Sequence, residues 1–209
     1  TKAFYEKLVV WAKTYEVGVV SDLAYGALGY QGYENPSFLS TPGAKDVGIE
    51  FYTFSKTFNM AGWRLAFAAG NEQMIEALNL IQDHLFVGIF PALQEAGIAA
   101  LLDPKSEEAV AQLNATYDSR RDAFVQAAAK IGWQAFPSRG SFYAWMPVPD
   151  GYTSESFADL LLEKAHVAVA PGKGFGPAGD AYVRIGLLVE PERLVEAVNR
   201  IANLHLFNN

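Results

Sequence analysis

Hydrophobic positions along the chain recur with two periods, one typical of helices and one typical of strands. The helical period predicts amphipathic helices over residues 2–15, 72–85, 92–102, 106–131, 154–165 and from 191 onward. Short apolar runs predict strands over residues 17–20, 49–54, 63–69, 133–136, 142–148, 167–170 and 182–188, and we expect the first three to be buried. Helices and strands alternate throughout, which predicts an α/β protein with a smaller α+β part.

Composition narrows the class of protein. The 209 residues are 51% hydrophobic and 19% charged, so the chain can bury a sizeable core. A net charge of −7 without any basic cluster argues against a nucleic-acid surface. The absence of cysteine excludes disulfides and thiolate metal sites, and His84, His166 and His205 lack metal-ligand spacing. With no membrane-spanning run and no signal peptide, we expect a soluble, cytoplasmic protein.

Candidate chemistry centres on residues 53–64, Thr-Phe-Ser-Lys-Thr-Phe-Asn-Met-Ala-Gly-Trp-Arg. The preceding strand delivers Lys56, and a desolvated lysine amine can act as a nucleophile or form a Schiff base. Arg64 is a permanent planar cation suited to a phosphate, and the hydroxyls of Thr53 and Ser55 flank the lysine. Taken alone, a Ser-Lys pair at a strand end is more often a solvated turn. Together these groups suggest a covalently held cofactor that carries a phosphate.

A second candidate pair follows the first predicted strand. Asp22 lies at its carboxyl end, where open α/β sheets bind ligands, and Tyr25 comes three residues later. The alternative for Asp22 is a cap for the turn over residues 23–26, which is the commoner role of such an aspartate. We therefore expect Asp22 and Tyr25 to face the same crevice, without excluding the cap.

The glycine-rich segment Pro171–Gly179 is a further motif to interpret. It does not match the Walker A spacing, and Pro177 stands where a dinucleotide fingerprint needs its third glycine. We predict a tight loop that does not bind phosphate. Residues 29–48, rich in Gly, Pro, Asn and Ser, also predict a loop.

In order along the chain, these residues form five motifs. They are Asp22-Leu-Ala-Tyr25, Thr53-Phe-Ser-Lys56 with Gly62-Trp-Arg64, Ser141-Phe-Tyr-Ala-Trp145, Pro171-Gly-Lys-Gly-Phe-Gly176 and Tyr182-Val-Arg184. In this order the chain resembles the class I/II aminotransferases, the pyridoxal-phosphate enzymes of fold type I. The resemblance implies an incomplete large domain over residues 1–111, a mostly parallel sheet with flanking helices, and a small α+β domain over residues 112–209.

The resemblance also implies a role for each candidate residue. Lys56 forms a Schiff base with pyridoxal 5′-phosphate and then moves the substrate proton. Asp22 keeps the pyridine nitrogen protonated, and Tyr25 donates to the 3′-oxygen of the cofactor. Arg64, Thr53 and Ser55 hold the phosphate, with Thr53 standing where the family usually has serine. Arg184 binds the substrate carboxylate as a bidentate fork, the alternative being a structural salt bridge.

The sequence departs from the family upstream of the lysine strand. Three cofactor elements of the family are missing: a glycine-containing turn, a ring-stacking aromatic residue and an asparagine in an Asn-Pro-x-Gly-type segment. We therefore expect a fragment that lacks the N-terminal part of the large domain and leaves a sheet edge and a hydrophobic face unpaired. The fragment alone is expected to be inactive, whereas the full-length protein is expected to be a homodimer.

Several functions are compatible with this resemblance. The first is an amino-acid aminotransferase that exchanges an amino group between an amino acid and a 2-oxo acid. A pyridoxal-phosphate-dependent C–S lyase is the alternative within the fold, although Gly62-Trp-Arg64 favours the aminotransferase. A non-catalytic module of a transcription factor would carry a basic extension, and none is visible. A Ser-x-x-Lys hydrolase is excluded because its partner motifs are absent.

The sequence does not indicate the substrate side chain, and the apolar run 86–90 is interpreted as core packing or, by resemblance, as part of a dimer interface.

Overall fold

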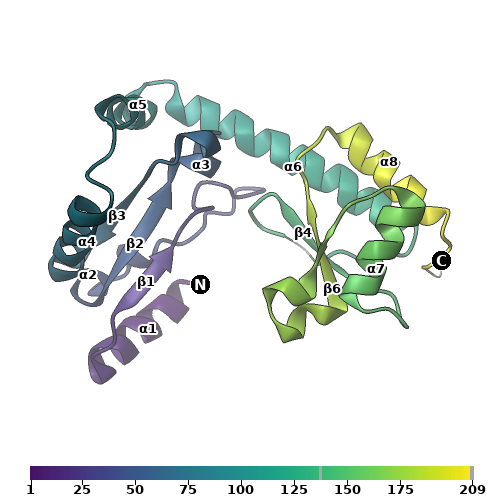
Figure 1. Cartoon of the computed structure of the whole chain (residues 1–209), viewed down its shortest axis with the longest axis horizontal. Helices are drawn as coiled ribbons and strands as arrows, with labels where there is room; N and C mark the ends of the chain where they lie inside the picture. Colours follow the sequence, from purple (N-terminus) through teal and green to yellow (C-terminus); the bar gives the residue numbers. More distant parts are fainter. Residues whose placement is uncertain (137, 208–209) are drawn as a thin grey trace. The chain divides into compact units, whose positions relative to one another are not determined.

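A computed structural model describes residues 1–136 and 138–207 of the chain (Figure 1). The chain forms two compact units, Thr1–Leu113 and Asn114–Asn209. The 25-residue helix α6 (Ser106–Lys130) runs across the boundary between them.

The first unit is built on a three-stranded sheet with the order β1-β2-β3. Strand β1 (Val19–Asp22) is parallel to β2 (Gly48–Thr53), and β3 (Ala66–Gly70) is antiparallel to β2. Asp22 lies opposite Phe51, so the carboxyl ends of β1 and β2 meet at the same edge of the sheet. This edge is where the candidate residues follow the strands.

Helices surround this sheet (Figure 1). They are α1 (Lys2–Tyr15), η1 (Phe38–Ser40), α2 (Ala44–Val47), α3 (Phe54–Thr57), η2 (Ala61–Trp63), α4 (Glu72–Leu85) and α5 (Pro91–Leu102). Helix α1 begins where the Thr1 hydroxyl accepts the N–H of Phe4 at 3.3 Å. It buries Val9 against Phe38 and Ala44, which fastens the predicted loop 29–48 to the sheet through two short helical turns.

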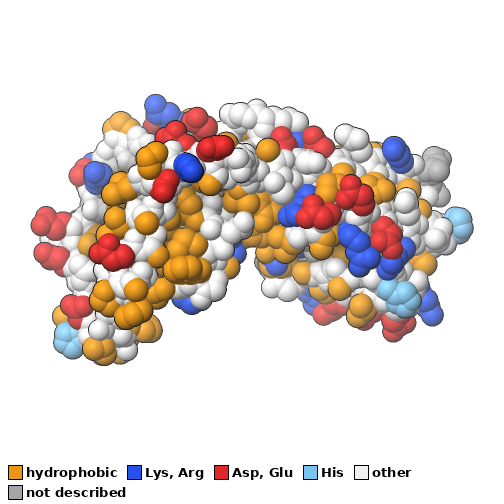
Figure 2. All heavy atoms as spheres, turned by 90° about the horizontal axis from the view of Figure 1, so that it is seen from above, with side chains coloured by type: hydrophobic (Ala, Val, Ile, Leu, Met, Phe, Trp, Pro, Cys, Tyr) orange, Lys and Arg blue, Asp and Glu red, His pale blue; other side chains and the backbone are white. Residues whose placement is uncertain are grey.

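The two outer strands are more exposed than the sequence predicts. Within the described residues, β1 and β3 each have a neighbouring strand on one side only. Val20 of β1 is 61% exposed and Phe67 of β3 is 43% exposed, so the expectation that these strands are buried was wrong. The expectation of an unpaired sheet edge and an uncovered hydrophobic face is confirmed for the described part of the chain. Figure 2 shows hydrophobic side chains gathered on the surface of this unit.

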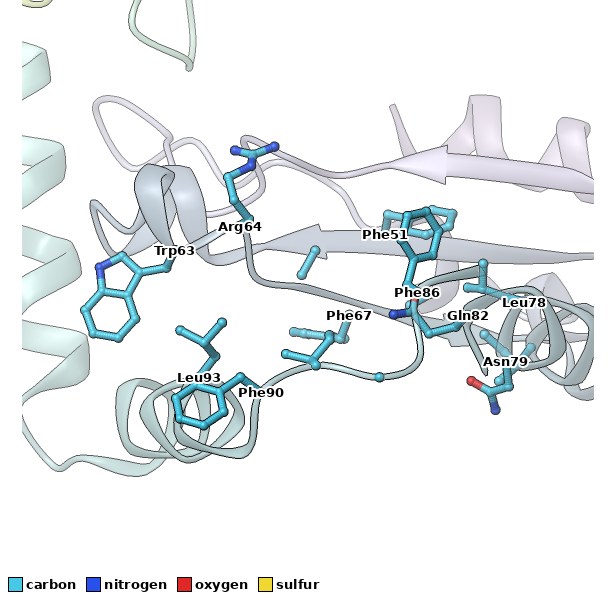
Figure 3. A pocket seen from close by; sticks show the side chains of 15 residues that line it. Phe51, Trp63, Arg64, Phe67, Leu78, Asn79, Gln82, Phe86, Phe90 and Leu93 are labelled. Carbon is cyan, nitrogen blue, oxygen red and sulfur yellow. The ribbon is translucent and has the colours of Figure 1, made fainter. Parts of the chain in front are cut away.

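The apolar run before α5 is also exposed. Val87 is 88% exposed, and Phe86 and Phe90 are more than half exposed, so the interpretation as core packing was wrong. Phe86 and Phe90 border a hollow of about 790 Å³ (Figure 3). Most of its wall is apolar and comes from β2, β3, α4, α5 and the segment between these two helices, as with Phe51, Phe67, Leu78, Phe86, Phe90 and Leu93. Large apolar surfaces of this kind mark places where other protein binds.

The second unit contains an antiparallel sheet with the order β4-β6-β5. Its elements after α6 are β4 (Tyr143–Pro147), α7 (Ser154–Leu160) with a π-helical continuation η3 (Leu161–Ala165), β5 (Ala170–Pro171), η4 (Gly172–Phe175), η5 (Pro177–Ala181), β6 (Tyr182–Gly186) and α8 (Pro191–Ala202). Alternation divides the sheet into two faces. One face, with Ala144, Met146, Val183 and Ile185, is buried in the core together with residues of α6, α7 and α8.

Two strand predictions in this unit were wrong. Residues 133–136 form no strand, because the buried Trp133 side chain points into the core and its indole N–H donates to the Pro147 carbonyl at 2.8 Å. The strand expected over residues 167–170 is reduced to Ala170–Pro171. Between the expected strands 133–136 and 142–148 the sequence also predicts a turn over residues 137–140, and this prediction lies partly outside the described residues, because residue 137 is not described.

Candidate active site

Lys56 lies just beyond the end of β2. The strand ends at Thr53, and Lys56 follows it in the one-turn helix α3, so the chain turns immediately after the strand that delivers the lysine. The reason is local, because the Thr53 hydroxyl caps this turn by accepting the N–H of Ser55 at 3.2 Å. The Lys56 side chain is half-buried, not fully desolvated.

Tyr25 is the structural partner of this lysine. The ammonium nitrogen of Lys56 lies 5.9 Å from the centre of the Tyr25 ring, within the range of a cation–π contact. Tyr25 follows β1 and Lys56 follows β2, so the pair forms where the two parallel strands end. The structure therefore brings together two of the residues that the sequence singled out from segments about thirty positions apart.

Asp22 forms the turn cap that the sequence left open as its alternative role. Its carboxylate accepts the N–H of Ala24 at 3.1 Å, which fastens the turn toward Tyr25. The same side chain is exposed, and strand alternation places it on the sheet face that carries Phe51 and Thr53. The cap leaves other acceptor positions of this exposed carboxylate accessible, because a carboxylate has several of them.

Asn35 holds the loop that carries Tyr25, and sequence reasoning did not single it out. Its side-chain amide donates to the carbonyls of Tyr25 at 3.1 Å, Gly26 at 3.3 Å and Leu28 at 3.0 Å. The Asn35-Pro36 pair is a common turn signal, but nothing in it indicates which carbonyls the amide will bind. This amide fixes the backbone around Tyr25.

The candidate phosphate-binding groups follow β2. Arg64 ends the η2 turn in a left-handed conformation (φ 54°), and its side chain is exposed. Its guanidinium donates to the Ala61 carbonyl at 3.0 Å, which leaves other N–H groups for an anion. In Figure 3 the Arg64 side chain points away from Phe90 and Leu93 of the hollow.

The hydroxyls of Thr53 and Ser55 differ in the hydrogen bonds that they make within the protein. Thr53 caps α3 and also donates to the Leu65 carbonyl at a long 3.4 Å. Within the described part of the chain, the half-buried Ser55 hydroxyl makes no hydrogen bond to protein. Ser55 is therefore the more available hydroxyl donor of the two.

Arg184 lies in the second unit, on the sheet face opposite the core. Its guanidinium carbon is 4.1 Å from the centre of the Tyr143 ring and 4.3 Å from that of Phe175. It pairs across the strands with Trp145. Among the described residues no carboxylate forms an ion pair with Arg184, so the structural salt bridge that the sequence left open is not formed there. Tyr143 and Phe175 belong to motifs noted in the sequence, but their contact with Arg184 was not foreseen.

The glycine-rich segment forms two 3₁₀ turns, η4 and η5, as expected of a tight loop. Gly172 and Gly179 lie back to back, and a Cβ atom on Gly172 would lie 2.2 Å from the Gly179 carbonyl oxygen. Asp180 of this segment accepts the hydroxyl of Ser154 at 2.8 Å and its N–H at 3.2 Å. The hydrogen bond from the Ser154 hydroxyl lowers the pKa of the Asp180 carboxyl below its ordinary value.

Neither a cluster of metal-ligating side chains nor a membrane-spanning helix is found among the described residues. Residues 1–136 and 138–207 contain no group of three or more potential metal-ligating side chains. None of the helices described there is long and apolar enough to cross a membrane.

The fold and the site together define a class of protein. A lysine beside a phenol fits an aldehyde cofactor that carries a phosphate and a ring nitrogen, since a carboxylate, two hydroxyls and an arginine lie at the ends of the same two strands or in the turns that follow them. The architecture is that of an incomplete fold type I pyridoxal-phosphate enzyme. The family model "Aminotransferase class I and II" matches residues 1–201, and the chain belongs to this family, which depends on pyridoxal phosphate.

Its relatives are aminotransferases. The chain is 56% identical over 207 residues to the L-glutamine–4-(methylsulfanyl)-2-oxobutanoate aminotransferase of Bacillus subtilis, covering 99% of this chain and 52% of that protein. It is 46% identical to the LL-diaminopimelate aminotransferase of Moorella thermoacetica, covering 95% of this chain and 50% of that protein. The substrate-bound structure of BacF from Bacillus subtilis matches with a TM-score of 0.94 and 45% identity, covering 99% of this chain and 52% of that one. The chain spans about half the length of the curated relatives it matches.

Proposed function

We propose that the whole protein is an amino-acid aminotransferase that exchanges an amino group between an amino acid and a 2-oxo acid. The observation that carries this proposal is the Lys56 amine, 5.9 Å from the Tyr25 ring at the shared carboxyl edge of β1 and β2. Pyridoxal phosphate, when bound, supplies an aldehyde for an amine and a ring that accepts electrons. The relatives' names point to glutamine, 4-(methylsulfanyl)-2-oxobutanoate and LL-diaminopimelate as the first substrates to try.

Each residue has a defined task in this proposal. Lys56 Nζ binds the cofactor and carries the proton that leaves the substrate Cα. Asp22 holds a proton on the ring nitrogen, and the Tyr25 hydroxyl donates to the ring oxygen. Arg64, Thr53 and Ser55 bind the phosphate, with Arg64 providing the charge. Arg184 receives the substrate carboxylate in the plane of its guanidinium.

The test uses the full-length protein with a panel of amino donors and 2-oxo acids. We expect transfer of the amino group with both products in equal amounts, and loss of this activity in Lys56→Ala. Lys45→Ala is the matched control, because Lys45 is a lysine of α2 outside the candidate site. Release of ammonia and a thiol instead of a transferred amino group would indicate the C–S lyase alternative. An active Lys56→Ala variant would refute the assignment of the lysine.

We further propose that the full-length protein is a homodimer and that the 209-residue chain alone is inactive. Among the described residues, the edges of β1 and β3 that lack a neighbouring strand and the open apolar hollow support the second statement, as does the half-length match to the relatives. The predicted cytoplasmic location stays a prediction, and fractionation of cells that express the full-length protein tests it.

A further inference from the structure

Glu50 is a carboxylate buried in the middle of β2, with only 7% of its surface exposed. Burying a carboxylate is costly unless other groups compensate for the lost water. Within the described residues no lysine, arginine or histidine forms an ion pair with it. Its compensation therefore comes from neutral donors.

Three donors converge on this carboxylate. The Ser21 hydroxyl and the Phe38 N–H both donate to Oε2, at 3.0 Å and 2.7 Å. The Ser37 hydroxyl donates to Oε1 at 2.5 Å. Hydrogen bonds to a charged acceptor are stronger than those between neutral groups, and here all of them end on one side chain.

The donors come from two places that bracket the candidate site. Ser21 immediately precedes Asp22 on β1, and residues 37–38 close the loop that begins after Tyr25. Both ends of segment 21–38 are thus fastened to the strand that leads to Lys56. Ser21 and Glu50 are paired in register on one face of the sheet, so Asp22 lies on the opposite face.

We infer that Glu50 is a positioning residue for the candidate active site. It does not lie on the cofactor side of the sheet and acts through the backbone of segment 21–38. By fixing both ends of this segment, it sets where Asp22 and Tyr25 lie relative to Lys56. The inference rests on the proposed function for the roles of Asp22 and Tyr25, whereas the ordering of the segment is independent of those roles.

Two substitutions at this position separate the hydrogen bonds from the side-chain volume. In Glu50→Gln the amide oxygen still accepts from Ser21 and Phe38, and the amide nitrogen can donate to the Ser37 hydroxyl, which also accepts. Glu50→Leu removes every acceptor and leaves the buried Phe38 N–H without a partner. Ile49→Ala is the matched control, since Ile49 is a buried neighbour on β2 that truncation destabilises without touching the segment's hydrogen bonds.

The experiment uses the full-length protein and has two readouts. In the cofactor-free protein, hydrogen exchange of peptides that cover residues 21–38 should accelerate about tenfold or more in Glu50→Leu and stay near wild type in Glu50→Gln and Ile49→Ala. With pyridoxal phosphate added, Glu50→Leu should raise the Kd for pyridoxal phosphate about tenfold. The same variant should shift the pH at which the absorbance of the bound cofactor changes halfway. In Glu50→Gln both quantities should stay close to their wild-type values.

The outcomes are distinct. The contrary result is that Glu50→Leu lowers the midpoint of unfolding as Ile49→Ala does and yet leaves three quantities unchanged: hydrogen exchange in residues 21–38, the Kd for pyridoxal phosphate and the pH midpoint of the cofactor absorbance. In that case Glu50 is only a core residue, and the inference is overturned. If Glu50→Leu does not fold, Ser37→Ala replaces it and should accelerate exchange in residues 30–38 about twofold to fivefold, with no acceleration counting against the inference. If the wild-type protein does not bind pyridoxal phosphate, the proposed function is refuted. Hydrogen exchange in residues 21–38 of the cofactor-free protein would still decide the role of Glu50.

Discussion

The guanidinium carbon of Arg184 lies 4.1 Å from the centre of the Tyr143 ring. Phe175 adds a second ring at 4.3 Å, so the cation is held by aromatic faces and not by a carboxylate of the described residues. A cation held in this way keeps its N–H edges for a ligand, whereas a salt bridge would occupy them. The geometry supports Arg184 as the group that receives a carboxylate.

Replacing Phe175 by leucine should weaken this arrangement. An exposed cation–π contact is worth about 0.5–1 kcal/mol, so under the proposed function the KM of the full-length protein for an amino-acid donor should rise about twofold to fivefold with kcat nearly unchanged. Phe136→Leu is the matched control, because Phe136 and Phe175 are both 53% exposed and Phe136 packs on Tyr182, away from Arg184. Equal KM changes in both variants would show that the Arg184 contact is irrelevant.

Thr53 should affect both folding and cofactor affinity. Thr53→Val removes the cap of α3, at a cost of about 1 kcal/mol, and removes one proposed phosphate contact. We expect a weaker affinity for pyridoxal phosphate, by about tenfold, measured by titration of the full-length protein. Thr53→Ser should restore both properties because serine keeps the hydroxyl.

Thr153→Val serves as the control for this prediction. Thr153 caps α7 in the other unit by accepting the Ser156 N–H at 3.2 Å. Its loss should lower the unfolding midpoint to a similar extent and leave the cofactor Kd unchanged. A Thr53→Val variant with wild-type cofactor affinity would remove Thr53 from the phosphate site.

Local sequence patterns predicted where helices and strands lie better than they predicted which of them are buried. The bounds of α1 and α4 match the helical period, and the lysine turn lies within a few residues of the predicted strand end. The predicted burial of β1 and β3 failed, because burial depends on neighbours that periodicity does not reveal. Valine and alanine occur both in central strands and in edge strands, so their presence in a sequence does not show which kind of strand they form.

The site shows the same division between local and distant information. Lys56, Asp22 and Tyr25 were singled out because each follows a strand at a short spacing. Glu50 and Asn35 were missed, because their partners are other segments' hydroxyl, N–H and carbonyl groups. No period or motif encodes which distant backbone group a polar side chain will meet.

Acid should selectively weaken the hydrogen bond between Ser154 and Asp180. The pKa of Asp180 is lowered in the folded protein by the Ser154 hydroxyl, so the folded state binds fewer protons than the unfolded state at this group. Its contribution to stability is therefore fully present above the unfolded value of about 3.9 and is lost as the pH falls through the lower folded value. The urea midpoint of the full-length protein should fall over this range.

Ser154→Ala should flatten that pH dependence, because it removes the first cause of the pKa shift. Ser156→Ala is the control, since Ser156 bonds Thr153 and not Asp180. Urea titrations between about pH 2 and pH 6 check the prediction. Identical acid profiles in wild type and Ser154→Ala would mean that this hydrogen bond contributes nothing to the pH dependence.

The 209-residue chain by itself should not retain pyridoxal phosphate in stoichiometric amount. In the described part of the chain, β1 and β3 have unpaired edges, and the hollow of about 790 Å³ beside β3 is lined mainly by apolar groups. Such surfaces promote association between chains, and nothing in them fixes Lys56 against a cofactor.

Light scattering at micromolar concentration should therefore report self-association. Borohydride reduction with added cofactor, followed by mass spectrometry, should label Lys56 well below one per chain, with the full-length protein labelled close to completion as the control. A monodisperse 209-residue chain that is fully labelled at Lys56 would contradict both this prediction and the proposal that the chain alone is inactive.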